Sequence, residues 1–269
     1  MSGLPATVEG KAAIDALIGE PESGLIASDF DGTLSPIVSE PSAARPQPGA
    51  IEVLTRLAAA VGTVAVVTGR PALQAIEVGG LDAVPGIIVL GQYGAQRWER
   101  GSLTAAPAPP GVEIVRAELP GVLSDAPAGT RIEDKGTALA VHTRQAPDPQ
   151  GTLEALRPAL ERLAKEAGLV AEPGRFVLEL RPPGTDKGTA LRELVGERHA
   201  RSVIYCGDDL GDLAAFAAIR ELRREGIPGC AVCSASPEAA RVARAADLVT
   251  DGPAGIVAFL ERLASRLRA

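Results

Sequence analysis

Short apolar runs that each end in a polar loop restrict the fold of this sequence more than any other feature. Leu25–Ser28, Thr63–Val67 and Gly86–Gly91 are such runs, and stretches with the apolar spacing of helices lie between them. The last third of the chain repeats the pattern with Ser202–Cys206, "GCAVC", "ADLVT" and a closing helix in "GIVAFLERLASRL". Uninterrupted apolar strands that alternate with helices are typical of a parallel sheet covered on both faces. The sequence therefore predicts an α/β domain.

The middle of the chain departs from this pattern. "GSLTAAPAPPG" (101–111) is rich in Gly, Ala and Pro, which predicts a linker. Three patterned segments follow it: the alternating "RIEDKGTALAVHTR", a helix marked by Leu153, Leu156, Leu160 and Leu163, and the strand-like "RFVLELR". Alternating strands of this kind have one solvent-facing side. We interpret residues 103–183 as an α+β domain inserted into a core formed by 1–102 and 184–269.

The hexapeptide "DKGTAL" occurs twice, at Asp134–Leu139 and at Asp186–Leu191. The first copy continues as "AVHTR", which alternates as a strand does, and the second continues as "RELVG", which favours a helix. Thr185 or Asp186 is placed to cap that helix. Because the two copies are predicted to lie in different elements, we interpret the repeat as two unrelated segments and not as a duplication.

Composition excludes several classes of protein. The net charge is −7, aromatic residues make up 3% and no Lys/Arg block is present, so we expect no nucleic-acid partner. No apolar run is long enough to cross a bilayer, and Met1–Glu20 lacks the build of a secretion signal. The three cysteines make no disulfide framework, and Cys230 and Cys233 have no second pair for a zinc site. We expect small buried core cysteines in a cytoplasmic monomer.

Two acidic loops follow predicted buried strands. Asp29 and Asp31, in "DFDGT", stand two residues apart and project to one side of an extended chain. "GDDLGD" (207–212) follows Ser202–Cys206 and opens a helix. Open α/β sheets bind ligands at this end of their strands, and Mg²⁺ prefers such carboxylates. The alternatives are a solvated D-G turn for the first loop and acids that suit a helix dipole for Asp209 and Asp212. Together the loops predict a divalent-metal site.

Two further segments suit a phosphate group. Thr68-Gly69-Arg70 follows the second strand and offers a hydroxyl and backbone N–H groups, and Lys187 stands at a predicted helix N-terminus. Taken singly, such a Thr is usually a helix cap and such a Lys is usually solvated. Four elements in order, each at a strand end or a helix start, favour a phosphate site.

This ordered set resembles the haloacid dehalogenase-like phosphatases. "DFDGTLSPIVSEP", "VVTGRP", "GQYGAQRW", "IEDKGTALAVHTR", "LELRPPGTDKGTAL" and "GDDLGD" narrow the resemblance to the trehalose-6-phosphate phosphatases. The resemblance covers nearly the whole chain. It implies a Rossmann-like parallel-sheet core, an inserted mobile cap, and a small-molecule sugar phosphate as substrate.

The resemblance also implies a two-step mechanism. Asp29 would attack phosphorus and form an aspartyl-phosphate, and Asp31 would act as general acid and then as general base. Mg²⁺ would be held by Asp29, the backbone carbonyl of Asp31 and Asp208, with Asp209 or Asp212 in support through water. Thr68 and Lys187 would complete the catalytic set by binding the phosphoryl oxygens.

Positions that the family uses for its sugar are matched in the insertion by Lys135, His142, Arg144, Glu179 and Arg181. In the core, we expect Thr33, Gly69, Arg70 and Gln96 to bind the substrate as well. His142 also reads as an ordinary histidine on a surface strand. Gln96 departs from the family, which commonly has Glu in the G-x-x-G-x-E segment. Gln keeps one acceptor oxygen and loses the charge, which bears on sugar affinity and not on phosphoryl transfer.

Four functions remain to be compared. The leading one is a Mg²⁺-dependent hydrolase that releases trehalose from trehalose 6-phosphate, and its rival is a phosphatase for another sugar phosphate, suggested by Gln96. A phospho-accepting signalling domain would also have an acidic pair and a lysine, but Asp31 and the large insertion disfavour it. A catalytically silent sugar-binding protein is disfavoured because every catalytic position is retained.

Overall fold

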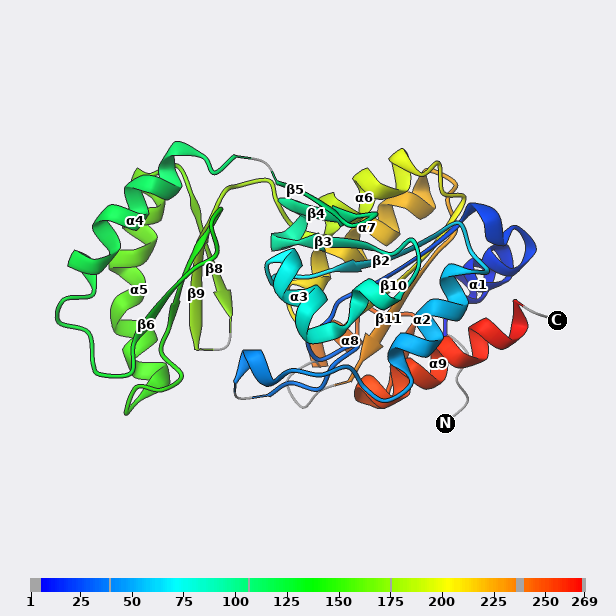
Figure 1. The fold of residues 1–269 in the computed structure, drawn as a ribbon, viewed down its shortest axis with the longest axis horizontal. Helices are drawn as coiled ribbons and strands as arrows, with labels where there is room; N and C mark the ends of the chain where they lie inside the picture. Colours follow the sequence, from blue (N-terminus) through cyan, green and yellow to red (C-terminus); the bar gives the residue numbers. More distant parts are fainter. Residues whose placement is uncertain (1–5, 39, 106, 175, 236–239, 268–269) are drawn as a thin grey trace. The chain divides into compact units, whose positions relative to one another are not determined.

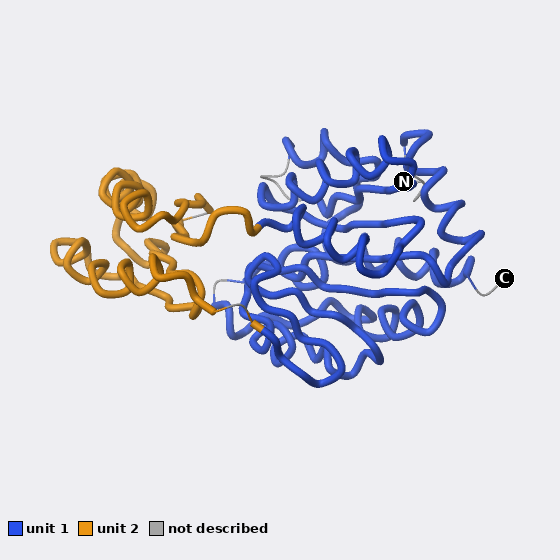
Figure 2. Tube along the Cα trace, turned by 90° about the horizontal axis from the view of Figure 1, so that it is seen from above, with its two compact units in different colours: residues 1–104, 186–269 blue, residues 105–185 orange. Residues whose placement is uncertain are grey.

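The computed structural model describes residues 6–38, 40–105, 107–174, 176–235 and 240–267. Two compact units divide the chain (Figure 2). The core unit is Met1–Thr104 with Asp186–Ala269, and the inserted unit is Ala105–Thr185. Among the described residues, no helix combines the length and apolar content that spanning a membrane requires.

The core unit is built on an eight-stranded sheet with helices on both faces (Figure 1). Its strands, in the order in which they pair, are β12 (Leu248–Thr250), β11 (Gly229–Ser234), β10 (Ser202–Gly207), β1 (Gly24–Ser28), β2 (Thr63–Val67), β3 (Ile88–Gly91), β4 (Gln96–Glu99) and β5 (Ser102–Ala105). The pairs from β12 to β3 are parallel, and β4 is antiparallel to β3. The predicted α/β class is therefore confirmed.

Strand alternation divides the core helices between the two faces of the sheet. One face of β1 presents Ile26 to α1 (Val8–Gly19), α2 (Ala50–Ala58), α3 (Ala72–Gly79) and α9 (Gly252–Arg266). The other face presents Leu25 and Ala27 to α6 (Lys187–Glu197), α7 (Asp212–Arg224) and α8 (Ala240–Ala243). Because successive side chains of a strand point to opposite faces, the consecutive apolar residues Leu25, Ile26 and Ala27 of β1 cover both layers.

The structure confirms the prediction that the three cysteines are buried core residues. All three are free and buried. Cys230 and Cys233 stand three apart on β11 and belong to the clusters on opposite faces of the sheet. Two thiols on opposite faces cannot bind one metal ion, so the two cysteines of the C-x-x-C sequence serve as packing residues of the core.

The inserted unit is a four-stranded antiparallel sheet with two helices. The strand order is β6 (Arg131–Asp134), β7 (Leu139–His142), β9 (Val177–Arg181) and β8 (Val170–Gly174). Leu139 and Val141 of β7 and Leu178 and Leu180 of β9 pack against α4 (Pro110–Val122) and α5 (Pro149–Glu166). The intervening residues of these strands therefore belong to the opposite face.

The predicted linker is wrong in its first part. Ser102–Ala105 forms β5, which pairs with β4 at the edge of the core sheet. All four of its residues are exposed. An exposed edge strand needs no apolar pattern, since backbone hydrogen bonds to one neighbour hold it. Its Ser, Thr and Ala therefore resemble a linker in sequence.

Candidate active site

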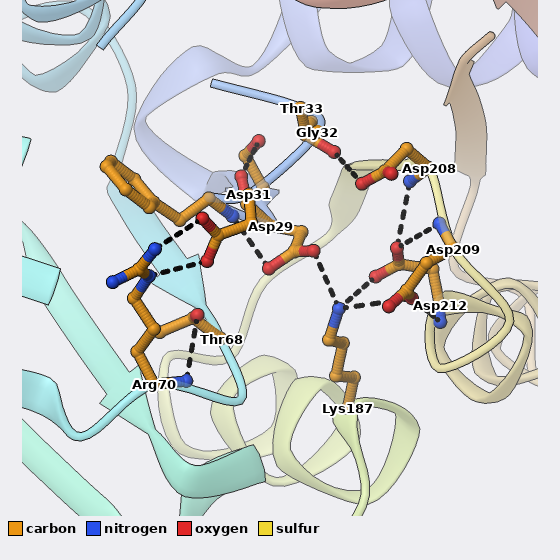
Figure 3. Close-up of polar contacts among 12 residues, drawn as sticks. Asp29, Asp31, Gly32, Thr33, Thr68, Arg70, Lys187, Asp208, Asp209 and Asp212 are labelled. Atoms are coloured by element: carbon orange, nitrogen blue, oxygen red, sulfur yellow. Dashed lines mark hydrogen bonds and ion pairs between the residues drawn. The ribbon is translucent and has the colours of Figure 1, made fainter. Parts of the chain in front are cut away.

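The catalytic candidates of the core lie where three neighbouring parallel strands end (Figure 3). Asp29 follows β1, Thr68 follows β2 and Asp208 follows β10. The chain builds β2 and β3 on one side of β1, and later returns to build β10 and β11 on the other side. Ligands of open α/β sheets bind at such a reversal of strand order.

Asp29 is held on both of its carboxylate oxygens. Its side chain is 5% exposed; Oδ1 accepts a hydrogen bond from the backbone N–H of Phe30 at 2.7 Å, and Oδ2 lies 2.8 Å from Lys187 Nζ. Burial raises the pKa of Asp29 well above its usual range, the charge of Lys187 opposes that rise, and the acids of the 208–212 loop add to it. The site thus has an excess of buried negative charge.

Lys187 is the first residue of α6 and is enclosed by carboxylates. Its ammonium lies 2.8 Å from Asp29 Oδ2, 2.8 Å from Asp212 Oδ1 and 3.6 Å from Asp209 Oδ1. Burial alone would lower the pKa of Lys187, but the three carboxylates raise it well above its usual range. Lys187 therefore carries its charge inside the protein, at the N-terminus of α6 as the sequence predicts.

Asp212 holds the ammonium group of Lys187 in place. It is fully buried, and its Oδ1 accepts hydrogen bonds from Lys187 Nζ and from the hydroxyl of Tyr205 at 2.7 Å. Its Oδ2 accepts the backbone N–H groups of Asp208 at 2.8 Å and Asp209 at 3.1 Å. Four donors for one buried carboxylate offset its desolvation. Asp212 thereby links the acidic loop to the lysine.

The sequence did not identify Tyr205 as a functional candidate. It lies inside an apolar strand, where its residue type is ordinary, and only the contact with Asp212 distinguishes it. Steric closeness explains why position 207 is a glycine, because a Cβ there would lie 2.3 Å from Asp212 Cγ. Glycine at this position lets the acidic loop fold back over the end of β10.

Asp208 lies on the other side of the acidic loop. Its side chain is buried, and the Thr33 hydroxyl donates to its Oδ1 at 2.9 Å. Gly32, with φ of 75°, passes so close that a Cβ would lie 2.1 Å from Asp208 Oδ2. Burial raises the pKa of Asp208 to about 8, and repulsion from Asp212 and Asp209 adds to the rise. No lysine or arginine pairs with Asp208 among the residues that the structure describes.

Asp31 and Arg70 form a two-bond ion pair. Arg70 Nε donates to Asp31 Oδ2 at 2.6 Å, and Nη2 donates to Oδ1 at 2.7 Å. The guanidinium also lies 5.8 Å from the centre of the Phe30 ring, and its Nη1 donates to the carbonyl of Pro41 at 2.9 Å. Both oxygens of Asp31 are thus bound by one side chain.

Hydrogen bonds to backbone groups hold the loop that contains Thr68. Thr68 Oγ1 accepts the N–H of Arg70 at 3.2 Å, and Thr68 N–H donates to Leu90 at 2.9 Å. A Cβ on Gly69 would lie 2.9 Å from the hydroxyl oxygen of Tyr93. Gln96 supports the same loop, since its Oε1 accepts the N–H of Ala72, the first residue of α3, at 2.8 Å.

The predicted metal ligands Asp29, Asp31, Asp208 and Asp209 do not form one group of carboxylates. Asp29, Asp209 and Asp212 have oxygens within 4.8 Å of one another, and Lys187 pairs with all three. The Asp31 carboxylate pairs with Arg70, whereas Asp208 contacts a hydroxyl. Among these four predicted ligands, Asp208 is therefore the one whose buried carboxylate pairs with no Lys or Arg of the described residues.

The sugar candidates of the inserted unit make polar contacts with carboxylates along its sheet. Lys135 Nζ lies 2.6 Å from Glu179 Oε2, His142 Nε2 lies 2.8 Å from Glu133 Oε2, and Arg181 Nη2 lies 3.1 Å from Glu172 Oε2. Glu179 and Arg181 alternate with the core residues Leu178 and Leu180, so they belong to the sheet face opposite the helices. Arg144 is exposed, two residues beyond β7.

One of these side chains has a buried polar atom that no hydrogen bond satisfies within the part of the chain that the structure describes. It is Oε1 of Glu179. The sequence did not identify Glu133 and Glu172, which pair with His142 and Arg181. The strand pairing could have identified both residues. Glu172 is in register with Glu179, and Glu133 is in register with Ala140, two residues before His142.

Comparisons with known proteins bear on both units. A family model described as Trehalose-phosphatase matches residues 27–250. The trehalose-phosphate phosphatase of Mycobacterium marinum (strain ATCC BAA-535 / M) is 35% identical over 280 residues, covering 99% of this chain and 67% of that protein. The trehalose-phosphate phosphatase of Mycobacterium tuberculosis (strain H37Rv) is 34% identical over 280 residues, covering 100% and 68%.

Solved structures share the fold. The C-terminal domain of C. albicans trehalose-6-phosphate phosphatase has a TM-score of 0.79 at 22% identity, covering 97% of this chain and 98% of that one. A haloacid dehalogenase-like hydrolase from Bacteroides thetaiotaomicron has a TM-score of 0.65 at 19% identity, covering 89% and 99%. These matches confirm the predicted haloacid dehalogenase-like fold.

Proposed function

Since the chain belongs to the trehalose-phosphatase family, we propose that this phosphatase hydrolyses trehalose 6-phosphate to trehalose and phosphate with Mg²⁺. The observation that carries the proposal is the arrangement of Asp29, Lys187 and Asp208 at the reversal of strand order. It combines a buried nucleophile, a cation for the phosphoryl group, and a further carboxylate in need of a cation.

Asp29 acts as the nucleophile. One carboxylate oxygen attacks phosphorus, the bond from phosphorus to the sugar oxygen breaks, and an aspartyl-phosphate forms. The Phe30 N–H holds Oδ1 in place, which leaves Oδ2, beside Lys187, as the oxygen aligned for attack. Water then attacks phosphorus and releases phosphate, which restores the carboxylate.

Asp31 carries the proton in both steps. It donates a proton to the departing sugar oxygen, and takes one from the attacking water in the second step, so protons balance over one turnover. Because Arg70 binds both oxygens of Asp31, this ion pair has to open before Asp31 can donate. Arg70 is adjacent to Gly69, where an arriving phosphoryl group would offer it a competing anion.

The phosphoryl oxygens are bound by Thr68, by the backbone of Gly69 and by Lys187. Lys187 stands at the N-terminus of α6, where its charge and the helix dipole both favour an anion. Asp212 and Tyr205 keep the ammonium in place, so little reorganisation is needed when charge develops.

Asp208, Asp29 and the backbone carbonyl of Asp31 would hold Mg²⁺, with Asp209 in support. The fit rests on oxygen donors alone and on the buried Asp208 carboxylate, which no basic side chain neutralises among the described residues. When bound, Mg²⁺ supplies positive charge that offsets the phosphate and the carboxylates. Thr33 orients Asp208 through its hydroxyl.

The disaccharide is bound by Lys135, His142, Arg144, Glu179 and Arg181. Oε1 of Glu179, which is buried and accepts no hydrogen bond from the described residues, is an acceptor for a sugar hydroxyl, and the Arg181 guanidinium is a donor. Such paired polar contacts give strong discrimination, since a wrong sugar leaves them unsatisfied.

A panel of sugar phosphates, assayed for kcat/KM with Mg²⁺ and with EDTA, tests the proposal. Trehalose 6-phosphate should give the highest value, and EDTA should abolish turnover. Preference for another sugar phosphate by about tenfold or more would establish the alternative function. Gln96 favours that alternative, because its acceptor oxygen is already used by Ala72.

A further inference from the structure

The turn between β6 and β7 presents Lys135. It spans residues 135–138, and the N–H of Lys135 donates to the carbonyl of Ala138 at 3.0 Å. Gly136 has φ of 85°, a left-handed conformation that favours glycine. The N–H of Gly136 donates to Asp134 Oδ1 at 2.8 Å, so the last residue of β6 also holds the backbone of the turn.

Arg116 of α4 binds this turn from the helix layer. Its Nε donates to Asp134 Oδ2 at 2.6 Å, and its Nη2 donates to Asp134 Oδ1 at 3.1 Å and to the carbonyl of Gly136 at 3.0 Å. Glu113, one turn earlier on α4, accepts a hydrogen bond from Nη1 and orients the guanidinium. One side chain thus binds the residues before and after Lys135.

The opposite end of Lys135 is held separately. Its ammonium pairs with Glu179 of β9 at 2.6 Å, and the side chains of Lys135 and Glu179 are 11% and 7% exposed. Arg116 therefore fixes the backbone at Lys135, and Glu179 fixes the charged tip. A lysine with four rotatable bonds needs both restraints to present its ammonium in one place.

We propose that Arg116 is a positioning residue for sugar specificity, which acts by fixing the turn that carries Lys135. The inference rests on the proposed function through the role of Lys135 in sugar binding. Arg116 is about one-third exposed, and exposed ion pairs contribute little to folding stability. Its loss should therefore affect the Michaelis constant for the sugar substrate more than the stability of the fold.

Three variants of the full chain test this. Arg116→Met removes every contact with the turn, and Arg116→Lys keeps the charge without the two-bond fork. Arg157→Met is the matched control, because it breaks the Arg157–Glu161 ion pair of α5 in the same unit.

Arg116→Met should raise KM for trehalose 6-phosphate by about five- to tenfold, and Arg116→Lys by less. For 4-nitrophenyl phosphate, both should stay within about twofold of wild type. Equal KM values for Arg116→Met and Arg157→Met would overturn the proposal.

Amide hydrogen exchange separates this inference from the proposed function. Without substrate, Arg116→Met should speed exchange at the Gly136 amide by about tenfold relative to Arg157→Met. If the wild-type protein does not hydrolyse trehalose 6-phosphate, the proposed function is wrong and the exchange result still judges the turn. Unchanged exchange at Gly136 overturns the role of Arg116 whatever the substrate.

Discussion

The two copies of "DKGTAL" give one hexapeptide two structures. At Asp134–Leu139 the aspartate accepts the N–H of the residue two positions on, and a left-handed Gly136 turns the chain into β7. At Asp186–Leu191 the aspartate accepts the N–H of Thr189, three positions on, and α6 begins. Both are common uses of an aspartate beside a free backbone N–H. What lies around each copy decides between them.

The glycine of each copy shows the same dependence on context. Gly136 supplies a backbone angle, and a Cβ there would meet open space. Gly188 instead allows α6 and α7 to pack closely, since a Cβ would lie 2.4 Å from the carbonyl oxygen of Ala214 on α7. The lysines then differ in their partners: Lys187 faces three carboxylates and Lys135 pairs with Glu179.

Removing Lys187 should have the largest effect. Lys187→Met takes away the cation that meets the phosphoryl group, so kcat should fall by about 10³-fold on every phosphoester, sugar or aryl. It also leaves Asp29 and Asp212 buried without their partner, which should destabilise the fold by about 3–5 kcal/mol. Steady-state kinetics and chemical unfolding measure the two losses. A variant with near-normal kcat would break the assignment of this copy to phosphate.

Removing Lys135 should have a smaller and narrower effect. Lys135→Met should lower kcat/KM for trehalose 6-phosphate by about 10–100-fold, because Glu179 loses its ion pair with Lys135 and the sugar loses a donor. The activity on 4-nitrophenyl phosphate should change by less than about threefold. Kinetics on the two substrates measure this. Equal losses on both would place Lys135 with the phosphate-binding groups.

One carboxyl group in each unit should make stability depend on pH, with opposite sign and in different pH ranges. Burial raises the pKa of Asp208 to about 8, above the unfolded value near 3.9. Between those values the folded state binds more protons, so core stability should fall as pH rises, by at most about 1.4 kcal/mol per pH unit. Hydrogen bonds from Arg116 lower the pKa of Asp134, so its contribution is present above the unfolded value and is lost as pH falls.

Guanidinium unfolding followed by the fluorescence of Trp98, on β4 of the core, measures the first trend. It should be run between pH 5 and 8 with EDTA. Mg²⁺ binds ionised carboxylates, so its stabilising effect should grow over the same range. Asp208→Asn should flatten both trends. A core whose stability rises with pH in EDTA would contradict the burial of an unpaired Asp208.

Tyr205→Phe should have the smallest effect. It removes one of the two side-chain donors to Asp212 Oδ1 and keeps the edge-on contact with Phe216. Loss of one hydrogen bond to a buried charge should lower kcat by about three- to tenfold on both substrates, with KM unchanged. An unchanged kcat with reduced stability would limit Tyr205 to a structural role.

Local pattern was sufficient for the parallel strands of the core and for the order of the polar loops, but it predicted neither β4 nor β5. Each of β1, β2, β10 and β11 is buried at every position, so its apolar run was plain in sequence. The helix at Pro110–Val122 was missed, because Pro110, Gly111 and Pro120 hide its spacing. Tertiary contacts such as Tyr205–Asp212 and Arg116–Asp134 join residues whose types are ordinary in their own elements. No local pattern could predict them.

The ratio of kcat/KM for trehalose 6-phosphate to that for 4-nitrophenyl phosphate tests most directly whether one hexapeptide performs two functions. It should be measured side by side in wild type, Lys135→Met and Lys187→Met. We predict a ratio reduced by about tenfold or more in Lys135→Met and within about threefold of wild type in Lys187→Met. The same ratio in both variants would contradict the separation of the two lysines.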